Sequence, residues 1–99
     1  MAKFRFTKKA VNDLTEIWDY TKKSLSEKQA EKYYQLIIQA CSEIAEDPSL
    51  GKEYFEVYPE VKGKMTTKHI IFYRQMNDKS IEITRILHER MDLKNRLKK

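Results

Sequence analysis

The 99-residue sequence predicts an α+β fold in which a helical hairpin packs on a small antiparallel sheet, in the order β-α-α-β-β-β. Three observations favour it. Two apolar stripes with helical spacing occupy residues 8–46, and only one or two residues separate them, so the helices must fold into a hairpin. Three β-forming segments follow between residues 61 and 87. The hairpin can bury its apolar stripe on one face of the sheet that these segments form.

The first elements begin close to the N-terminus. Phe4 and Phe6 alternate with basic residues, which indicates a short half-buried strand. Thr7 can then cap a helix over residues 8–24, whose apolar side chains recur every three or four positions. This spacing gives the helix one apolar face.

The second helix has a clear start and a clear end. Ser26 opens a capping box, in which its hydroxyl accepts a backbone amide of the first turn. Asp47 ends the helix, because the proline after it disfavours helical geometry. Residues 48–59 are expected to form a loop, with Gly51 as its flexible point.

The remaining strands are expected to pair as an antiparallel meander. The first spans 61–65, and the second is the continuous apolar run 69–73, which suits a central strand buried on both faces. A turn at 76–79 leads to the third strand over 81–87. Residues 90–97 could add a short C-terminal helix, followed by a basic end, and the whole chain 1–99 is expected to form one domain.

Composition excludes several classes of function. Hydrophobic residues make up 40% and charged residues 35% of the chain, which is typical of a soluble globular domain. No apolar run approaches the roughly 18–20 residues of a membrane span, and no secretory segment is evident, so a cytoplasmic protein is expected. Cys41 is alone, and His69 and His88 have no third ligand, so neither a metal site nor a cofactor is expected.

The net charge of +5 is unevenly distributed. Residues 1–25 contain six basic and three acidic residues, residues 26–60 three and eight, and residues 61–99 eleven and four. The basic C-terminal part fits an acidic partner, either nucleic acid or an acidic protein segment. A solvated surface without a partner would have the same composition.

Several stretches, taken in order from residue 4 to 97, resemble one known family. They are Ala10-Val11-x-Asp13-Leu14-x-x-Ile17-x-x-Tyr20, Gln29-Ala30-x-x-Tyr33, Pro48-x-x-Gly51-Lys52, His69-x-Ile71-Phe72-Tyr73-Arg74 and Ile83-x-Arg85-Ile86-Leu87-His88-x-x-Met91-Asp92. This set resembles the ParE toxins of the RelE/ParE superfamily, which belong to type II toxin–antitoxin systems.

The resemblance implies a toxin that a ParD-like antitoxin neutralises. ParE toxins inhibit DNA gyrase by binding, so the resemblance implies a topoisomerase poison and not an enzyme, with contact to gyrase-bound DNA as one further interaction. The alternative is the RelE branch, whose members are ribosome-dependent mRNA endonucleases. Fold alone does not decide between the two branches.

An RNA endonuclease would need a base, clustered cations and an acid on one sheet face. Lys64, Arg74 and His88 are the residues that such an activity would use. Against it, no tyrosine follows Tyr73, whereas nucleases of the superfamily often place one near the C-terminus. His88 also has a structural interpretation, as a strand-end histidine that bonds a neighbour, and His69 is expected to be structural.

Six residues are candidates for binding the antitoxin or the target. They are Tyr20, Arg74, Arg85, Arg90, Lys94 and Arg96. Arg74 and Arg85 could instead satisfy carboxylates such as Glu82, and the C-terminal cations could be a solvated end. The aromatic residues of the helices are expected to be mostly core, although Tyr20 could lie at the edge of the stripe. A groove between the hairpin and the sheet edge would receive an amphipathic antitoxin helix.

Overall fold

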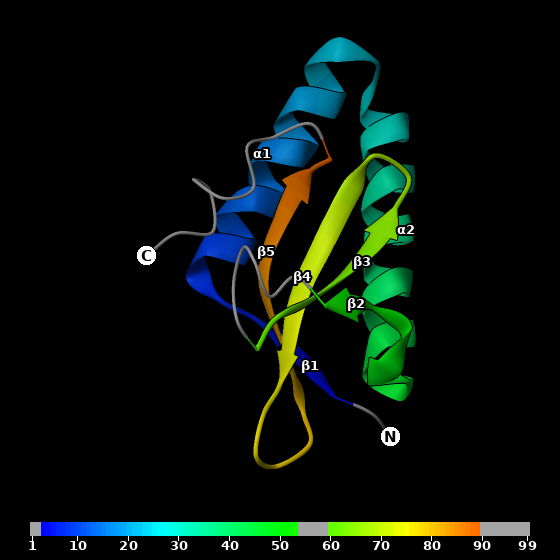
Figure 1. The fold of residues 1–99 in the computed structure, drawn as a ribbon. Coiled ribbons are helices and arrows are strands. Elements are labelled where there is room, and N and C mark those ends of the chain that lie inside the picture. The colour runs from blue at the N-terminus through cyan, green and yellow to red at the C-terminus, as the bar shows by residue number, and fades with distance from the viewer. Residues whose placement is uncertain (1–2, 54–59, 90–99) are drawn as a thin grey trace.

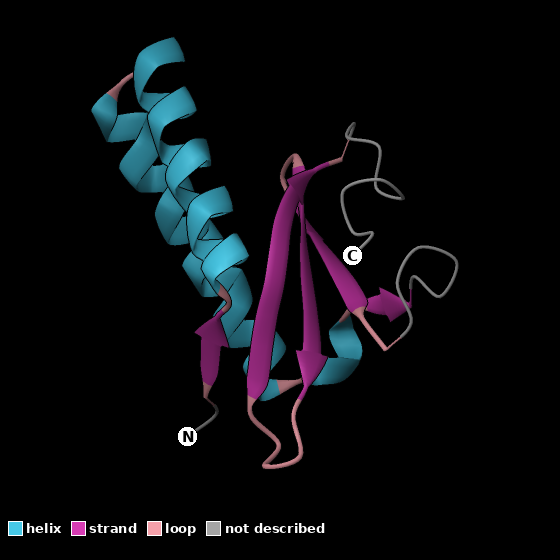
Figure 2. Cartoon of the chain, turned by 90° about the vertical axis from the view of Figure 1, so that its left-hand side faces the viewer, coloured by secondary structure: helices cyan, strands magenta, loops and turns pink. Residues whose placement is uncertain are grey.

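The computed structural model describes residues 3–53 and 60–89, and within them it confirms the predicted α+β fold (Figure 1). In chain order the elements are β1 (Phe4–Phe6), α1 (Lys8–Ser24), α2 (Glu27–Glu46), the 3-10 helix η1 (Pro48–Leu50), β2 (Lys52–Glu53), β3 (Lys62–Thr66), β4 (His69–Gln75) and β5 (Ile81–His88). Figure 2 shows α1 and α2 side by side on one face of the sheet. The predicted C-terminal helix and the basic end lie outside the described residues. No helix in the described part of the chain is long and apolar enough to span a membrane.

The sequence predicts an antiparallel sheet, but the sheet is mixed because one pair of strands is parallel. Its strand order is β1-β5-β4-β3-β2, and β3, β4 and β5 form the predicted antiparallel meander. The exception is β1, which pairs in parallel with β5, with Phe4 opposite Ile81 and Phe6 opposite Ile83. A parallel pair needs a long connection, and the helices together with β2 to β4 supply it.

Both helices begin where their capping residues predict. The Thr7 hydroxyl accepts the backbone amide of Ala10 at 3.1 Å and donates to the carbonyl of Thr84 at 2.9 Å. Ser26 caps α2 in the same way, by accepting the amide of Gln29 at 3.1 Å. The cap of α1 therefore also ties the start of the helix to β5.

The segment after α2 differs from the predicted loop, because it contains η1 and the two-residue strand β2. Gly51 is not a flexible point. Its amide donates to the Tyr73 hydroxyl at 2.8 Å, and that hydroxyl donates to the carbonyl of Pro48 at 2.6 Å. A Cβ atom at Gly51 would lie 2.4 Å from the Tyr73 hydroxyl oxygen. The glycine is required by this close approach, and the tyrosine fixes the turn.

The core lies between the hairpin and the sheet. Its buried members are Ala10, Ile37, Ala40, Cys41, Ile44, Ala45, Ile71, Tyr73, Ile81, Ile83 and Ile86. Residues 70–73 of β4 are all buried, which confirms a central strand covered on both faces. Tyr20 is the exception that the sequence allows for: its side chain is 74% exposed and lies outside the core. Trp18 and Tyr34 are partly buried and pack edge to face.

A bulge in β5 controls which residues face the helices. Phe72 pairs with Arg85 and Tyr73 with Ile83, so Thr84 is the extra residue. The Thr84 hydroxyl donates to the carbonyl of Phe72 at 3.1 Å. Because of this irregularity, Ile83 and Ile86 both enter the core although three positions separate them. The bulge thus sets the orientation of the C-terminal half of β5, where the groove described next lies.

Candidate partner-binding groove

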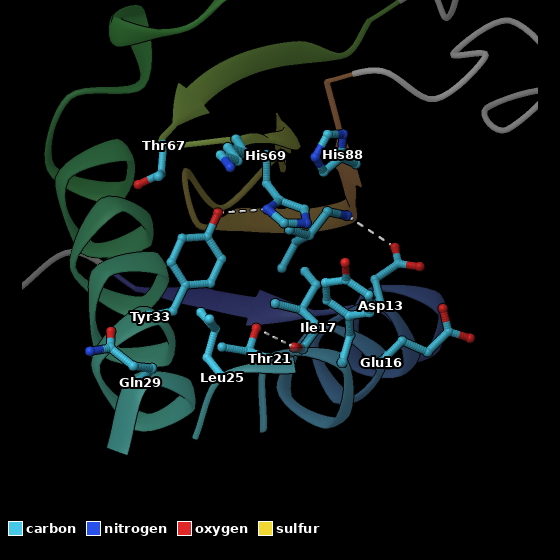
Figure 3. A pocket seen from close by; sticks show the side chains of 13 residues that line it. Asp13, Glu16, Ile17, Thr21, Leu25, Gln29, Tyr33, Thr67, His69 and His88 are labelled. Atoms are coloured by element: carbon cyan, nitrogen blue, oxygen red, sulfur yellow. Dashed lines mark hydrogen bonds between the residues drawn. The ribbon is translucent and has the colours of Figure 1, made fainter. Parts of the chain in front are cut away.

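A groove of about 680 Å³ opens between the helical hairpin and the ends of β4 and β5 (Figure 3). Its volume lies within the range of about 300–1,000 Å³ that is usual for ligand pockets. It is lined by Asp13, Glu16, Ile17, Tyr20, Thr21, Leu25, Gln29, Tyr33, Thr67, Lys68, His69, Ile86 and His88. The groove therefore occupies the place that the sequence predicts for the antitoxin helix, beside the hairpin at the sheet edge.

One face of α1 forms a wall of the groove. Residues 13, 16, 17, 20 and 21 line it, with the spacing of three and four that brings side chains onto one side of a helix. The tip of the hairpin extends beyond the strand ends in Figure 1. Tyr20 and Leu25, near that tip, are 74% and 71% exposed. Apolar side chains are thus presented where the sheet no longer covers them.

The floor of the groove contains Tyr33, His69 and His88 from three different elements (Figure 3). The Tyr33 hydroxyl and Nδ1 of His69 share a hydrogen bond of 2.6 Å, and the two histidine rings pack edge to face with centroids 5.2 Å apart. Burial, together with the nearby His88, lowers the pKa of His69 to about 4. Burial raises the pKa of Tyr33. His69 is therefore neutral near pH 7 and is held by its neighbours, as the structural interpretation expects.

A buried ion pair closes the sheet edge beside the groove. Asp13 accepts two bonds from Arg85, 2.7 Å from Nε to Oδ2 and 2.9 Å from Nη2 to Oδ1. Its Oδ2 also accepts the amide of Ile86 at 3.0 Å. Since β1 ends at Phe6, the carboxylate provides the acceptor that a longer β1 would otherwise offer to β5. The hydrogen bonds to Asp13 raise the pKa of Arg85, which stays protonated.

Arg74 lies at the other end of the sheet and has a different partner. Its Nε is 2.9 Å from Oε1 of Glu82, and Arg5 approaches the other oxygen of Glu82 at 3.8 Å. The pairing of Arg74 with Glu82 is one of the two alternatives that the sequence leaves open for this residue, the other being contact with the antitoxin or the target. For Arg85 the same interpretation holds, but the carboxylate is that of Asp13.

The three residues that a nuclease would use do not share a site. Arg74 is paired in register with Glu82, whereas His88 is paired with His69, five positions away along β4. That separation corresponds to about 16 Å of strand. Arg74 also follows the core residue Tyr73 and so points to the opposite sheet face. Lys64 lies two strands from His88, on β3, where it pairs with Ile71.

Three of the six candidate partner-binding residues lie in the described part of the chain, and they do not lie together. Tyr20 lines the groove, whereas Arg74 is bonded to Glu82 at the other end of the sheet. Arg85 is not a lining residue, but it is bonded to Asp13, which is one. Arg90, Lys94 and Arg96 lie outside the described residues. Sequence reasoning missed Leu25 and Lys68 as groove residues. Leu25 follows Ile17 and Thr21 at intervals of four residues and so continues the apolar stripe of the first helix, but its exposure depends on how far the hairpin extends past the sheet.

The family-like sequence pieces meet one another across the two layers. Asp13 of the first piece bonds Arg85 of the last, and Tyr33 of the second bonds His69 of the fourth. The hydroxyl of Tyr73 joins the fourth piece to the glycine of the third. These three contacts hold the hairpin and the turn on the sheet. Among the residues that the structure describes, no three His, Cys, Asp or Glu side chains are grouped to hold a metal ion.

Comparison with known proteins gives consistent matches. Residues 4–93 match the family described as the ParE toxin of the type II toxin–antitoxin system parDE. The toxin ParE1 of Mycobacterium tuberculosis is 33% identical over 84 residues, which cover 85% of this chain and 86% of that protein. A structure of the chromosomal ParDE system from P. aeruginosa has a TM-score of 0.74 at 23% identity, and covers 89% of this chain and 96% of its own. The M. tuberculosis RelBE2 toxin–antitoxin complex has a TM-score of 0.62 at 18% identity, covering 89% of this chain and 98% of its own. At these identities the two structures support the fold alone.

Proposed function

We propose that this chain, which belongs to the ParE toxin family of type II toxin–antitoxin systems, inhibits DNA gyrase by binding and is neutralised by a ParD-like antitoxin. The observation that carries the binding mechanism is the separation of Lys64, Arg74 and His88. A ribonuclease would have to gather such groups around one phosphate, whereas a protein that acts by contact needs no catalytic constellation.

The internal bonding of the motif residues supports the same mechanism. Arg85 donates two bonds to Asp13, and Arg74 is bonded to Glu82. The guanidinium groups of Arg74 and Arg85 are thus bonded to carboxylates of the chain itself. The groove, with the exposed side chains of Tyr20 and Leu25 at its rim, offers apolar surface to a partner.

The antitoxin would place an amphipathic helix in the groove. Helix-in-groove recognition uses apolar anchors at helical spacing. Ile17 on the α1 wall, together with Tyr33 and Ile86, provides apolar surface between the rim and the sheet edge. Occupation of the groove would cover the apolar side chains near the hairpin tip.

The C-terminal cations are proposed to contact gyrase-bound DNA or an acidic protein surface. Residues 61–99 carry a net charge of +7, part of it from Lys94 and Arg96. Lysine and arginine side chains in this region suit phosphate contacts, which weaken as salt rises. Deletion of residues 91–99 tests this role: reduced toxicity is expected, and unchanged toxicity would remove the segment from the mechanism.

The proposed function is tested by expressing the chain in bacteria without an antitoxin. Thymidine and methionine incorporation are followed over the first minutes after induction, and co-expression of the antitoxin encoded beside the toxin serves as control. We expect DNA synthesis to fall first while protein synthesis continues, and the antitoxin to prevent the fall. An immediate collapse of methionine incorporation would instead indicate a ribosome-dependent endonuclease. No change in either rate, with the protein folded and present, would contradict toxicity itself.

A further inference from the structure

The groove carries opposite charges on its two sides. On the α1 side, Asp13 and Glu16 lie near one guanidinium, that of Arg85, so these three groups sum to −1. Asp13 uses both oxygens for internal bonds, whereas the exposed Glu16 is placed to meet an incoming group. The turn between β3 and β4 contributes the exposed ammonium group of Lys68. The groove is therefore bipolar, although the chain as a whole is basic.

Apolar surface lies between these charges. Within residues 3–53 and 60–89, Tyr20 and Leu25 are the most exposed of the large hydrophobic side chains, and both line the groove. Ile17 and Ile86 continue the apolar surface inward from the rim. Contiguous exposed apolar surface with a charged border is typical of a protein-binding site.

We infer that the groove takes an apolar segment of the antitoxin that sets a cationic side chain, arginine or lysine, against Glu16 and a carboxylate against Lys68. This inference rests on the proposed function for the identity of the occupant. It differs from the expectation based on net charge, in which the segment presents only acidic residues to the toxin. A uniformly acidic segment would bring like charges together at Glu16, and such a juxtaposition is unfavourable in an interface.

The position of the segment is tested with the full chain and the antitoxin encoded beside it, by measuring the Kd. Leu25→Glu is compared with Leu36→Glu, because Leu36 is also an exposed leucine, at 45%, but lies on α2 outside the groove lining. We expect Leu25→Glu to weaken binding by at least about 30-fold, in the range of hot-spot residues, and Leu36→Glu by less than about threefold. The Kd of Tyr20→Ala tests a second residue at the rim of the groove. Circular dichroism verifies that each variant folds.

The polarity is tested with Glu16→Lys on the same chain. We expect it to weaken binding by about tenfold, and one arginine or lysine of the antitoxin, when reversed to glutamate, to restore the affinity to within about threefold of the original pair. Tighter binding of Glu16→Lys, or the absence of any restoring reversal, would overturn the assigned polarity. If Leu25→Glu and Leu36→Glu changed the Kd equally and Tyr20→Ala left it unchanged, the antitoxin would bind outside the groove. The proposed function would still hold. No binding by the unaltered chain would instead remove the antitoxin from the proposed function.

Discussion

At the scale of single residues, Asp13 joins helix α1 to strand β5, although nothing in the sequence around it indicates this role. Its side chain satisfies Arg85 and the amide of Ile86, both more than seventy positions away in the chain. Asp13 is 8% exposed, so its charge depends on these partners in place of water. Removing one side of a buried ion pair costs much more than removing an exposed charge, because the remaining charge has lost its compensation.

Replacement of Asp13 by alanine should therefore lower the free energy of unfolding by about 3–5 kcal/mol. Glu16→Ala is the matched control, because it removes a carboxylate one turn further along the same helix but from an exposed position, and should change stability by less than about 0.5 kcal/mol. Urea denaturation measures both values. Equal losses for the two variants would show that the ion pair contributes little to stability.

Gly51 gives a second prediction at this scale. Gly51→Ala places a methyl group 2.4 Å from the Tyr73 hydroxyl oxygen and should destabilise the fold by about 1–3 kcal/mol. Tyr73→Phe keeps the ring but removes the bonds to Gly51 and Pro48, and should also cost about 1–3 kcal/mol. Thermal unfolding followed by circular dichroism compares them with the unaltered chain. A Gly51→Ala protein as stable as that chain would mean that the turn can move away from the tyrosine.

The predictability of these residues depends on their distance along the chain. Arg74 and Glu82 lie on consecutive strands of a hairpin, so their proximity could be predicted from the turn between them. Asp13 and Arg85 meet only because the hairpin folds back beside the last strand. The role of Gly51 was missed for the same reason, since the tyrosine that requires a glycine there is twenty-two positions away.

At the scale of elements, the helices could be predicted closely because their boundaries depend on local chemistry. Thr7 and Ser26 bond amides three positions ahead, so each cap can be recognised within a few residues. The parallel pairing of β1 could not be recognised in this way, since a three-residue strand carries no information about its neighbour. The groove was expected between hairpin and sheet, but its lining depends on the bulge at Thr84 and on the length of the helices.

The junction of α2, β4 and β5 leads to a prediction about pH. The pKa of His69 is about 4 in the folded chain, below its ordinary value of 6.5. Below pH 6.5 the unfolded chain therefore binds more protons at this site than the folded chain, and stability falls with pH. The stability that depends on a neutral His69 is fully present above about pH 6.5. It declines as the pH falls and is lost below about pH 4.

Two measurements check this effect. NMR titration of the ring protons should give a midpoint for His69 near 4. His69→Asn, whose side-chain oxygen can still accept from Tyr33, should lose less stability than the unaltered chain between pH 7 and pH 5. A midpoint near 6.5 would show that the imidazole is not desolvated by the groove floor.

At the scale of the whole molecule, charge and apolar surface contribute differently to binding. The net charge of +5 assists the approach of an acidic partner, whereas buried apolar anchors determine how slowly the partner leaves. For the antitoxin complex we expect the Kd to rise by less than about tenfold between 50 and 500 mM salt, since apolar anchors in the groove dominate over rim charges. A much steeper dependence, measured by calorimetry, would assign the affinity to the basic surface instead.

Purified DNA gyrase allows the proposed action of this ParE-family chain, inhibition by binding, to be measured without other cellular components. The chain is added to gyrase, ATP and supercoiled plasmid, and linear DNA is quantified after detergent and protease treatment, with and without the antitoxin. Accumulation of linear plasmid that requires gyrase, and that an equimolar amount of antitoxin abolishes, is the predicted result. Unchanged gyrase products at saturating toxin, together with mRNA cleavage in a translating ribosome mixture, would contradict the claim and identify the chain as a nuclease.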